Sequence, residues 1–319
     1  MGVIMYHIIV NPASRSGRGR HIWTETVKPA LTEKNISYSV YFSKKAGDVP
    51  QLAKKIIAEH FSDNAAEKPC RLIILGGDGT VNEALQGIAP STNVIIGYIP
   101  TGSSNDLARD LGIPKDPLKA LSRILDAEAH PERICTMDRG LVKTDNGCRS
   151  FAVSCGIGFD AAVCEEVMHS KLKVMLNKLK LGKLTYLGIA LKQLFTAKPV
   201  SCTLYLDDKE PICIKKILFI ASMTHRFEGG GFKFCPMADY TDGLFDLCVV
   251  GNIPKLLILF ALPTAFFGKH LLVPGIDHYR AARIRITTGA PLWAHTDGEV
   301  LGRADGMEIT CIKQDIKFI

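Results

Sequence analysis

The sequence of 319 residues has no apolar run long enough to cross a bilayer, because its longest, residues 256–267, is short and contains Pro263. It also has no internal repeat and no low-complexity tract, and because a strand-like HIIVN begins at residue 7 we expect no signal peptide. These absences argue against a transmembrane protein, a repeat array and a disordered chain. With 47% hydrophobic and 22% charged residues, we expect a cytoplasmic protein with two folded domains.

Paired cysteine motifs are absent too. None of the ten cysteines belongs to a CxxC pair, and most lie in apolar, strand-like runs. A zinc site is therefore not expected, and a chain of this length needs no disulfide framework. We expect buried, reduced thiols. The net charge of +7 fits an anionic partner such as a nucleotide or an acidic membrane surface, and we expect no nucleic-acid partner.

The most informative stretch is RLIILGGDGTVNE, residues 71–83. Its apolar part predicts a buried parallel strand, its glycines a turn, and its end a helix from about Val81. A glycine-rich turn at a helix N-terminus lets backbone N–H groups approach a phosphate. Asp78 would repel phosphate unless it binds a cation or a proton, so it is a candidate for magnesium contact or for orienting a hydroxyl. The alternative is an ordinary turn with an aspartate cap.

The first hundred residues alternate strand and helix, which is typical of a parallel sheet. Strands are predicted at residues 7–11, 37–43, 72–75 and 94–99. Ligands bind at the carboxyl ends of such strands, and three of these strands are followed by polar, glycine-bearing loops. The topology gathers Asn11, Ser14, residues 76–80 and residues 103–106 at one edge, which we interpret as a nucleotide site.

The second half of the chain reads as short strands separated by turns such as residues 207–208 and 241–243. The predicted strands are residues 150–154, 201–206, 213–221, 244–250, 283–287, 292–295 and 307–312. We predict a mostly antiparallel β-sandwich, interrupted by helical segments at 161–196 and 255–270. The two domains are placed at residues 1–138 and 139–319, with a C-terminal tail that can return to the first domain.

Four motifs together resemble the diacylglycerol kinase catalytic family, which includes bacterial soluble lipid kinases and the sphingosine and ceramide kinases. They are N-P-x-S from Asn11, GGDGT at 76–80, NDLAR at 105–109 and DGE at 297–299. GGDGT alone also occurs in NAD kinases, whereas the combination is specific and extends from residue 8 nearly to the C-terminus. One loop departs from the family pattern G-T-x-N-D, because Ser103 replaces the threonine, but the serine keeps the hydroxyl. The resemblance implies an α/β N-terminal domain with a parallel, NAD-kinase-like sheet, a C-terminal β-sandwich, and ATP with Mg²⁺ in the cleft between them.

The resemblance also implies roles for single residues. Glu299 would be the general base with Asp297 near it, Asp78 would lie close to the transferred phosphate, and Asp138 would be a further acidic residue near the active site. With the edge residues above, the predicted ATP-binding set is Asn11, Ser14, Ser43, Gly76, Gly77, Asp78, Gly79, Thr80, Val81, Asn82, Gly102, Ser103, Asn105 and Asp106. A structural magnesium of the bacterial members would map to Asp239, Asp242 and the carbonyl of Leu244.

Two further patterns have alternative readings. GIGFDA at 156–161 fits a G-x-G-x-x-A dinucleotide fingerprint, but no later strand ends in an acidic residue that would hold a ribose. We interpret it as a tight strand-to-helix turn. Lysines interleave with leucines at residues 171–184, which fits either a surface helix packed on the sandwich or an interfacial helix on anionic lipid. Residues 256–267 would extend the same apolar surface, and we expect peripheral association with the membrane, where a lipid substrate has to be reached.

Phosphoryl transfer to an alcohol needs a phosphate cradle, a cation and a base aligned with the hydroxyl. The sequence therefore predicts an ATP- and Mg²⁺-dependent kinase of a diacylglycerol-like lipid. The alternatives are a kinase of a sphingoid base, another glycerolipid or NAD, and a catalytically silent nucleotide- or lipid-binding regulator. A homodimer also stays open.

Overall fold

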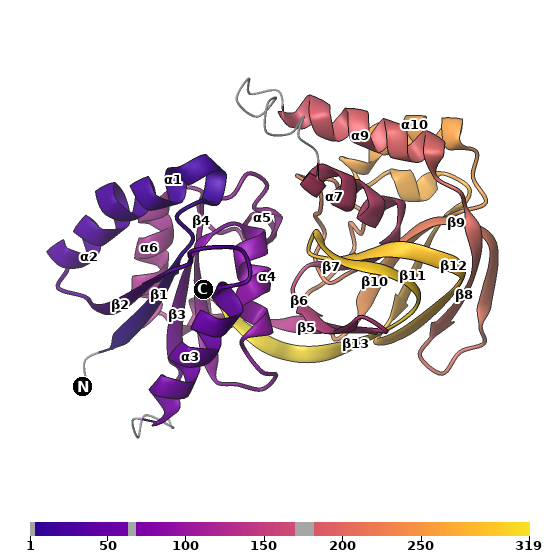
Figure 1. The fold of residues 1–319 in the computed structure, drawn as a ribbon. Coiled ribbons are helices and arrows are strands. Elements are labelled where there is room, and N and C mark those ends of the chain that lie inside the picture. The colour runs from indigo at the N-terminus through magenta and orange to yellow at the C-terminus, as the bar shows by residue number, and fades with distance from the viewer. Residues whose placement is uncertain (1–3, 63–67, 170–181) are drawn as a thin grey trace. The chain divides into compact units, whose positions relative to one another are not determined.

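The structure, a computed structural model, describes residues 4–62, 68–169 and 182–319. They form two compact units, drawn as a ribbon in Figure 1. Unit 1 comprises residues 1–139, 240–242 and 312–319, and unit 2 comprises residues 140–239 and 243–311.

Unit 1 alternates strands and helices. Its elements are β1 (Met5–Val10), α1 (Ser14–Ile22), the π-helix η1 (Trp23–Val27), α2 (Lys28–Glu33), β2 (Ser37–Phe42), α3 (Val49–Ser62), β3 (Cys70–Gly76), α4 (Asp78–Gln86), β4 (Val94–Pro100), α5 (Asp106–Asp110), α6 (Pro117–Asp126), the 3-10 helix η2 (Pro131–Arg133) and the start of β5 (Cys135–Thr144).

The strands of unit 1 form a parallel sheet in the order β2-β1-β3-β4. Its middle strands are near-continuous apolar runs, and Ile8, Ile73 and Ile74 are fully buried, because helices cover both faces. Figure 1 shows α1, α2 and α6 on one face and α3 and α4 on the other. The end of β13 (Glu299–Phe318) extends the sheet, since Phe318 pairs in parallel with Ile96 of β4.

Unit 2 is built mainly of antiparallel strands. Its elements are the remainder of β5, β6 (Gly147–Phe151), β7 (Ser154–Gly158), α7 (Phe159–His169), α9 (Gly182–Thr196), β8 (Val200–Leu206), β9 (Ile212–Met223), β10 (Phe245–Gly251), α10 (Lys255–Ala265), the 3-10 helix η3 (His270–Leu272), β11 (Ile276–Ala281), β12 (Arg283–Thr296) and most of β13.

The strands of unit 2 follow the order β11-β10-β9-β7-β12-β13, and β8 pairs with both β9 and β12. Their inward side chains form one core, in which the rings of Phe151 and Phe245 stack at 5.6 Å among Leu204, Ile220 and Ile286. The predicted fold class, a parallel α/β domain followed by a mostly antiparallel β-sandwich, is confirmed.

Several predicted boundaries are wrong. The strand predicted at 150–154 is broken at Ala152 and Val153, between β6 and β7. The strands predicted at 283–287 and 292–295 are one strand, β12, with an irregular register between Thr287 and Leu292. α4 begins at Asp78 rather than near Val81, since an aspartate is favourable in the first turn of a helix.

Two expectations concern membranes. Most of the lysine-rich segment at 171–184 lies outside the described residues. Among the helices of the described part, none is both long enough and apolar enough to cross a membrane.

Candidate functional site

Side-chain hydrogen bonds join three loops of unit 1 at the carboxyl edge of the parallel sheet. Asn11, directly after β1, donates from Nδ2 to Thr80 Oγ1 at 3.0 Å. Ser14 Oγ and Thr101 Oγ1, the latter directly after β4, share a hydrogen bond of 2.7 Å. The loops that the sequence topology predicts at one edge therefore do lie together.

Glycines allow the loops after β3 and β4 to approach closely. A Cβ at Gly102 would lie 2.8 Å from the Cα of Gly77 and 2.6 Å from Asn105 Oδ1. A Cβ at Gly76 would lie 2.5 Å from the side chain of Thr80. A side chain at Gly102 would push the two loops apart, so glycine allows their close approach. Because α4 starts directly after Gly77, the positive end of its dipole lies at this edge and favours an anion.

Asp78 is fixed from two sides. Its Oδ1 accepts a hydrogen bond from the Tyr98 hydroxyl at 3.1 Å, and its Oδ2 accepts one from the backbone N–H of Asp106 at 2.8 Å. Burial and the Asp78 carboxylate raise the pKa of Tyr98 well above its ordinary value, so the phenol stays protonated and donates. The half-buried carboxylate is thereby oriented.

The NDLAR segment is held in shape by its own contacts. Asn105 has a φ of 51° and donates from Nδ2 to the carbonyl of Gly102 at 3.1 Å. The buried carboxylate of Asp106 forms an ion pair with Arg109, with 2.6 Å between Oδ1 and Nη1. These contacts show that Asn105 and Asp106 shape the loop beside Asp78.

The other predicted nucleotide contacts differ in exposure. Ser103 is exposed and Gly79 is half-buried, whereas Val81 and Asn82 are buried in α4. Ser43 follows β2 at the same edge, where its N–H donates to the carbonyl of Val10 at 3.0 Å. Their roles in binding ATP stay predictions.

The loop after β1 combines positive charge with backbone strain. Arg15, Ser16 and Gly17 have φ values of 49°, 59° and 94°, a left-handed run that is costly for residues other than glycine. Strain of this kind is concentrated at functional sites. Arg15, Arg18 and Arg20 are exposed, and guanidinium groups suit phosphate. Our sequence prediction omitted these arginines, although their clustering beside Ser14 is visible in the sequence.

Asp138 has a structural environment. Its side chain is fully buried, Oδ1 accepts a hydrogen bond from the N–H of Gln314 at 2.7 Å, and its own N–H donates to the carbonyl of Tyr240 at 2.7 Å. These contacts fasten three separate chain segments within unit 1. The predicted active-site role of Asp138 stays a prediction.

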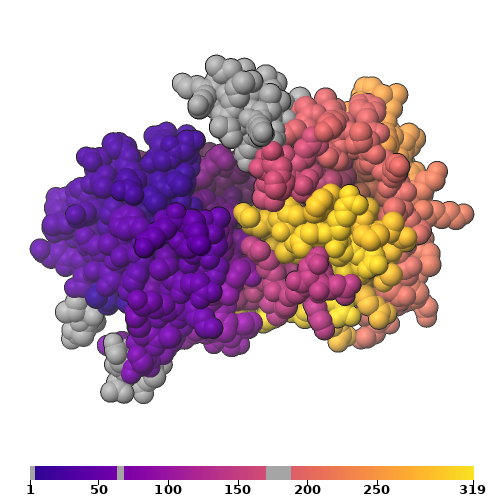
Figure 2. All heavy atoms as spheres, in the orientation of Figure 1, coloured from indigo at the N-terminus to yellow at the C-terminus, as the bar shows by residue number. Residues whose placement is uncertain are grey.

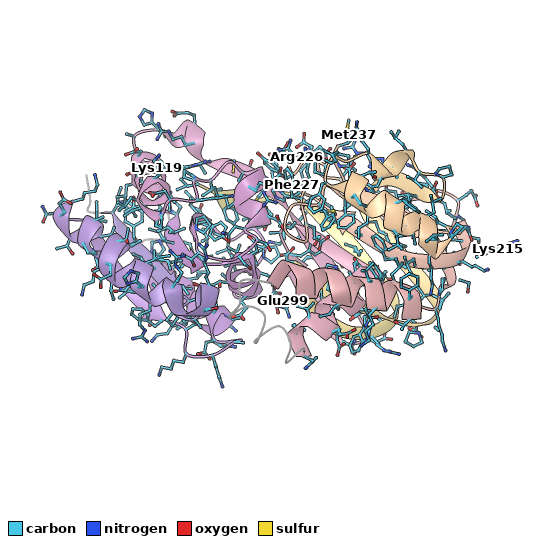
Figure 3. The ribbon with its side chains drawn as sticks, turned by 90° about the horizontal axis from the view of Figure 1, so that it is seen from above. Lys119, Lys215, Arg226, Phe227, Met237 and Glu299 are labelled. Carbon is cyan, nitrogen blue, oxygen red and sulfur yellow. The ribbon has the colours of Figure 1, made fainter. Side chains whose placement is uncertain are left out.

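In unit 2 the DGE motif forms the turn between β12 and β13. The carboxylate of Asp297 accepts hydrogen bonds from the N–H groups of Ala152, Val153 and Ser154 at 3.0, 2.8 and 2.9 Å. This explains the break between β6 and β7, since these N–H groups turn toward Asp297. Asp297 therefore positions the turn, and the half-buried Glu299, labelled in Figure 3, opens β13 directly after it.

A buried histidine network supports this turn, and sequence reasoning missed it. His295 is 1% exposed, with its Nε2 3.1 Å from Asp160 Oδ2 and 3.7 Å from Glu228 Oε1. The N–H of Gly298 lies 3.2 Å from Nδ1 of His295, to which it donates while the ring is neutral. Ser154 Oγ donates to Glu228 Oε1 at 2.5 Å. The network thus links the DGE turn to the start of α7 and to the segment after β9.

The network also perturbs its titratable groups. Burial raises the pKa of Glu228 to about 7, with the charge of Asp160 adding to the effect and His295 opposing it. Burial acts to lower the pKa of His295, but the carboxylates of Glu228 and Asp160 outweigh it and raise this pKa to about 9. Perturbed groups of this kind cluster at functional sites.

The GIGFDA segment belongs to the same network. Gly156 and Gly158 are in β7, and α7 starts directly after it at Phe159, so the strand-to-helix change is as tight as predicted. A Cβ at Gly156 would collide with Asp160 Oδ2 and the ring of His295. The glycine is therefore required by the histidine network, a reason that the motif alone does not reveal.

The predicted structural metal site falls in the loop between β9 and β10. Asp239 is exposed, while Asp242 and Leu244 are half-buried. The carbonyls of neighbouring Tyr240 and Thr241 accept hydrogen bonds from Asp138 N–H and Gln314 Nε2. The metal role of Asp239, Asp242 and Leu244 stays a prediction.

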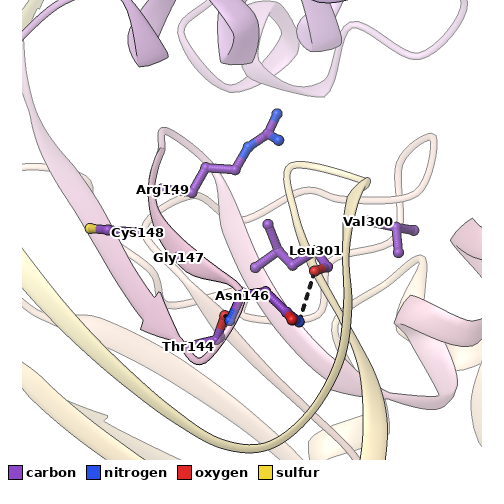
Figure 4. A pocket seen from close by; sticks show the side chains of 7 residues that line it. All are labelled: Thr144, Asn146, Gly147, Cys148, Arg149, Val300 and Leu301. Carbon is purple, nitrogen blue, oxygen red and sulfur yellow. Dashed lines mark hydrogen bonds between the residues drawn. The ribbon is translucent and has the colours of Figure 1, made fainter.

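A hollow of about 240 Å³ lies beside the start of β13 in unit 2 (Figure 4). It is lined by Thr144, Asn146, Gly147, Cys148, Arg149, Val300 and Leu301, and Asn146 Nδ2 donates to the carbonyl of Leu301 at 3.1 Å. Its lining is largely polar, so it does not suit an acyl chain.

Comparison with known proteins now decides the family. The diacylglycerol kinase catalytic domain model matches residues 5–137, and the model of the YegS C-terminal NAD kinase beta sandwich-like domain matches residues 153–317. A diacylglycerol kinase of Bacillus subtilis strain 168 is 30% identical over 304 residues, which cover 94% of this chain and 91% of that protein. The chain belongs to the diacylglycerol kinase family. This membership makes it an enzyme of the kinase class.

Other proteins match over similar lengths. The protein YtlR of Bacillus subtilis strain 168 is 27% identical over 303 residues, covering 93% of this chain and 94% of YtlR. The solved structure of a diacylglycerol kinase from Bacillus anthracis str. Sterne superposes with a TM-score of 0.69 over 99% of this chain and 96% of that chain. At 20% sequence identity, this likeness shows the fold.

Proposed function

We propose that this enzyme transfers the γ-phosphate of ATP, with Mg²⁺, to a free hydroxyl of a diacylglycerol-like lipid. The observation that carries the proposal is the carboxyl edge of the parallel sheet in unit 1, which we call the glycine edge after Gly76, Gly77 and Gly102. There, three loops and the oriented carboxylate of Asp78 surround the N-terminus of α4. The names of the relatives support a lipid acceptor.

The residues of this edge are chemically suited to bind a nucleoside triphosphate together with its cation. Gly77 and Gly102 let the two loops pack directly before the N-terminus of α4, an end that favours phosphate, and Arg15 and Arg18 supply exposed positive charge. Asp78 supplies oxygen ligands of the kind that Mg²⁺ prefers. When bound, ATP provides the phosphoryl group and Mg²⁺ neutralises the charge on it.

In this proposal Glu299 takes the proton of the acceptor hydroxyl on a carboxylate oxygen. Asp297 and His295 position it, because both fasten the turn from which Glu299 projects. A positioned base of this kind contributes typically 10²–10⁴-fold, by order of magnitude.

The test is transfer of labelled γ-phosphate from ATP to lipids in mixed micelles. The panel contains diacylglycerol, monoacylglycerol, sphingosine, ceramide and phosphatidylglycerol, with NAD alongside. Strong labelling of diacylglycerol that disappears in Glu299→Gln is expected. Labelling of sphingosine or NAD instead would replace the proposed acceptor, and labelling of nothing while ATP binds would favour a silent regulator.

We also propose that one face of unit 2 brings the enzyme to an anionic membrane. The outer side of α10 and the adjoining η3 expose Leu256, Phe260, Phe267 and Leu272, each more than 60% exposed. A soluble helix normally presents polar residues there. Figure 2 shows α10, in orange, at the surface of unit 2.

This face is continuous with a neighbouring apolar loop. The rings of Phe232 and Phe266 stack with centroids 4.0 Å apart, and the N–H of Lys233 donates to the carbonyl of Ala265. The loop continues to Met237, which is 72% exposed. Arg226, Phe227 and Met237 of this loop are labelled in Figure 3.

The charge of this apolar face favours anionic lipid as its binding partner. Residues 251–276 contain two lysines and no acidic residue. A hollow of about 380 Å³ at the start of α10 is lined by Lys215, Lys216 and Lys255 together with Leu218 and Ile258. Apolar side chains flanked by lysines are the pattern of an interfacial contact with anionic headgroups.

Vesicle co-sedimentation tests this face. The protein is expected to bind phosphatidylcholine vesicles only when phosphatidylglycerol is included, and Phe260→Ser with Phe267→Ser should weaken binding at least about tenfold. Leu118→Ser, an exposed leucine of α6 in unit 1, is the matched control. Equal binding by the double variant would reject this face as the membrane contact, and no binding to either vesicle would reject the membrane and favour a protein partner.

A further inference from the structure

Three metal-ligating side chains converge in unit 1 away from the nucleotide loops. One ring nitrogen of His7, one of His60 and Sγ of Cys70 all lie within 4.8 Å of one another. His7 is on β1, His60 is near the end of α3, and Cys70 is the first residue of β3. His7 and Cys70 occupy the amino-terminal halves of their strands, whereas the glycine loops follow the carboxyl ends.

The fold fixes this convergence. His7 is in register with Leu72 of the neighbouring parallel strand, and Cys70 is two residues before Leu72, so all three project from the same face of the sheet. α3 contacts both β1 and β3. His60 lies one turn after the buried Ile56, on the side of α3 that faces the sheet.

We propose that His7, His60 and Cys70 bind one transition-metal ion of the zinc class. Two imidazoles and a thiolate are the ligands that Zn²⁺ prefers, whereas Mg²⁺ and Ca²⁺ prefer oxygen. Three protein ligands leave the fourth tetrahedral position to water.

Two contacts support the proposal. Nδ1 of His7 is buried without a hydrogen-bond partner among the described residues, a costly state for a polar atom. Nε2 of His60 lies 3.1 Å from the carbonyl of Lys68. That bond requires the proton on Nε2 and leaves the lone pair on Nδ1, the arrangement in which a carbonyl orients a metal-bound imidazole.

Binding would involve no change of oxidation state. The metal forms bonds to two imidazole nitrogens and to Sγ, and the thiol proton passes to solvent. The bound ion would tie the end of α3 to β1 and β3. Ligands this far apart in sequence form no spacing motif, which is why the absence of CxxC pairs does not exclude the site.

Cobalt spectroscopy on the untagged full-length protein tests the proposal. After treatment with a chelator, titration with Co²⁺ should give the visible bands of tetrahedral cobalt and a thiolate charge-transfer band, saturating at one ion per chain. Zn²⁺ should displace the cobalt. Zn²⁺ should also raise the melting temperature of the chelator-treated protein, because it binds the folded chain.

Variants locate the signal. Cys70→Ser should abolish the charge-transfer band, and His60→Gln, which leaves the buried thiol in place, should weaken Co²⁺ binding at least about tenfold. Cys148→Ser, an exposed cysteine of unit 2, is the control that should bind like the parent. A parent protein without the charge-transfer band, or a band that survives Cys70→Ser, would overturn the proposal. None of these readouts depends on kinase activity.

Discussion

The N–H of Gly298 lies 3.2 Å from Nδ1 of His295 and donates a hydrogen bond to it when the imidazole is neutral, which ties the middle of the DGE turn to a buried ring. The opposite ring nitrogen faces the carboxylates of Asp160 and Glu228. The turn that carries Glu299 is thus supported by the hydrogen bonds and ion pairs of His295. Protonation of this histidine should therefore affect the stability of the protein.

The first prediction is a pH dependence of stability that originates at His295. Its pKa is about 9 in the folded protein against an ordinary value of 6.5. A raised pKa means that the folded state binds more protons, so this contribution is complete below pH 6.5 and is lost as the pH rises through 9. The melting temperature should therefore fall across this range in the parent and fall less in His295→Asn. Parallel slopes would show that His295 does not titrate in this way.

The second prediction concerns the base. Glu299→Gln should lower kcat at least about a hundredfold with little change in the KM for ATP, because a positioned proton acceptor is lost while the glycine edge is intact. Glu308→Gln is the matched control, since Glu308 lies exposed on the same strand, β13. Steady-state kinetics check both, and a Glu299→Gln enzyme with parental kcat would remove Glu299 from the mechanism.

The third prediction concerns the close approach of Gly102 to Gly77. In Gly102→Ala, the added methyl group would lie 2.8 Å from the Cα of Gly77, so the loops must separate. The affinity for ATP, measured by calorimetry, should fall at least about tenfold, which is the loss of roughly one good hydrogen bond to a charged group. Gly306→Ala, where the nearest atom to a Cβ is 3.7 Å away, should bind ATP like the parent. Equal affinities in both variants would contradict a role for this approach.

The fourth prediction concerns the orientation of Asp78. Tyr98→Phe deletes the hydroxyl that donates to Asp78 Oδ1 and so removes one hydrogen bond to this carboxylate. The free energy of unfolding should fall by about 1–3 kcal/mol. Activity should fall less than in Asp78→Ala, for which a loss of at least about a hundredfold is expected. Denaturant unfolding and kinetics of the two variants decide the order, and a Tyr98→Phe enzyme as poor as Asp78→Ala would assign the hydroxyl a direct role.

The sequence predicted the strands of unit 1 and the gathering of its loops because both follow from local patterns. Apolar runs such as residues 72–75 specify buried parallel strands, and parallel topology alone brings Asn11 and Thr80 to one edge. The sandwich was likewise visible in short apolar runs, and the family motifs located Asp297 and Glu299.

The histidine network was not predictable in this way. Asp160, Glu228 and His295 come from three separate segments, and although Asp160 lies in the GIGFDA segment, that motif does not indicate its partners. The break at Ala152 and Val153 was missed for the same reason, since it depends on Asp297, far along the chain. Long-range polar contacts determine these features, and local hydrophobic periodicity does not record them.

The parallel sheet of unit 1 is assembled from distant parts of the chain. Residues 312–319 return to it, where Phe318 pairs with Ile96 and the carboxylate of Asp315 pairs with the guanidinium of Arg139, each side chain 2% exposed. On the ribosome, residues 1–139 emerge long before residues 312–319 have been synthesised. Until then Arg139 has no carboxylate to offset its burial, and the edge of β4 lacks its neighbour. The first unit to be translated is therefore expected to be among the last to complete its folding.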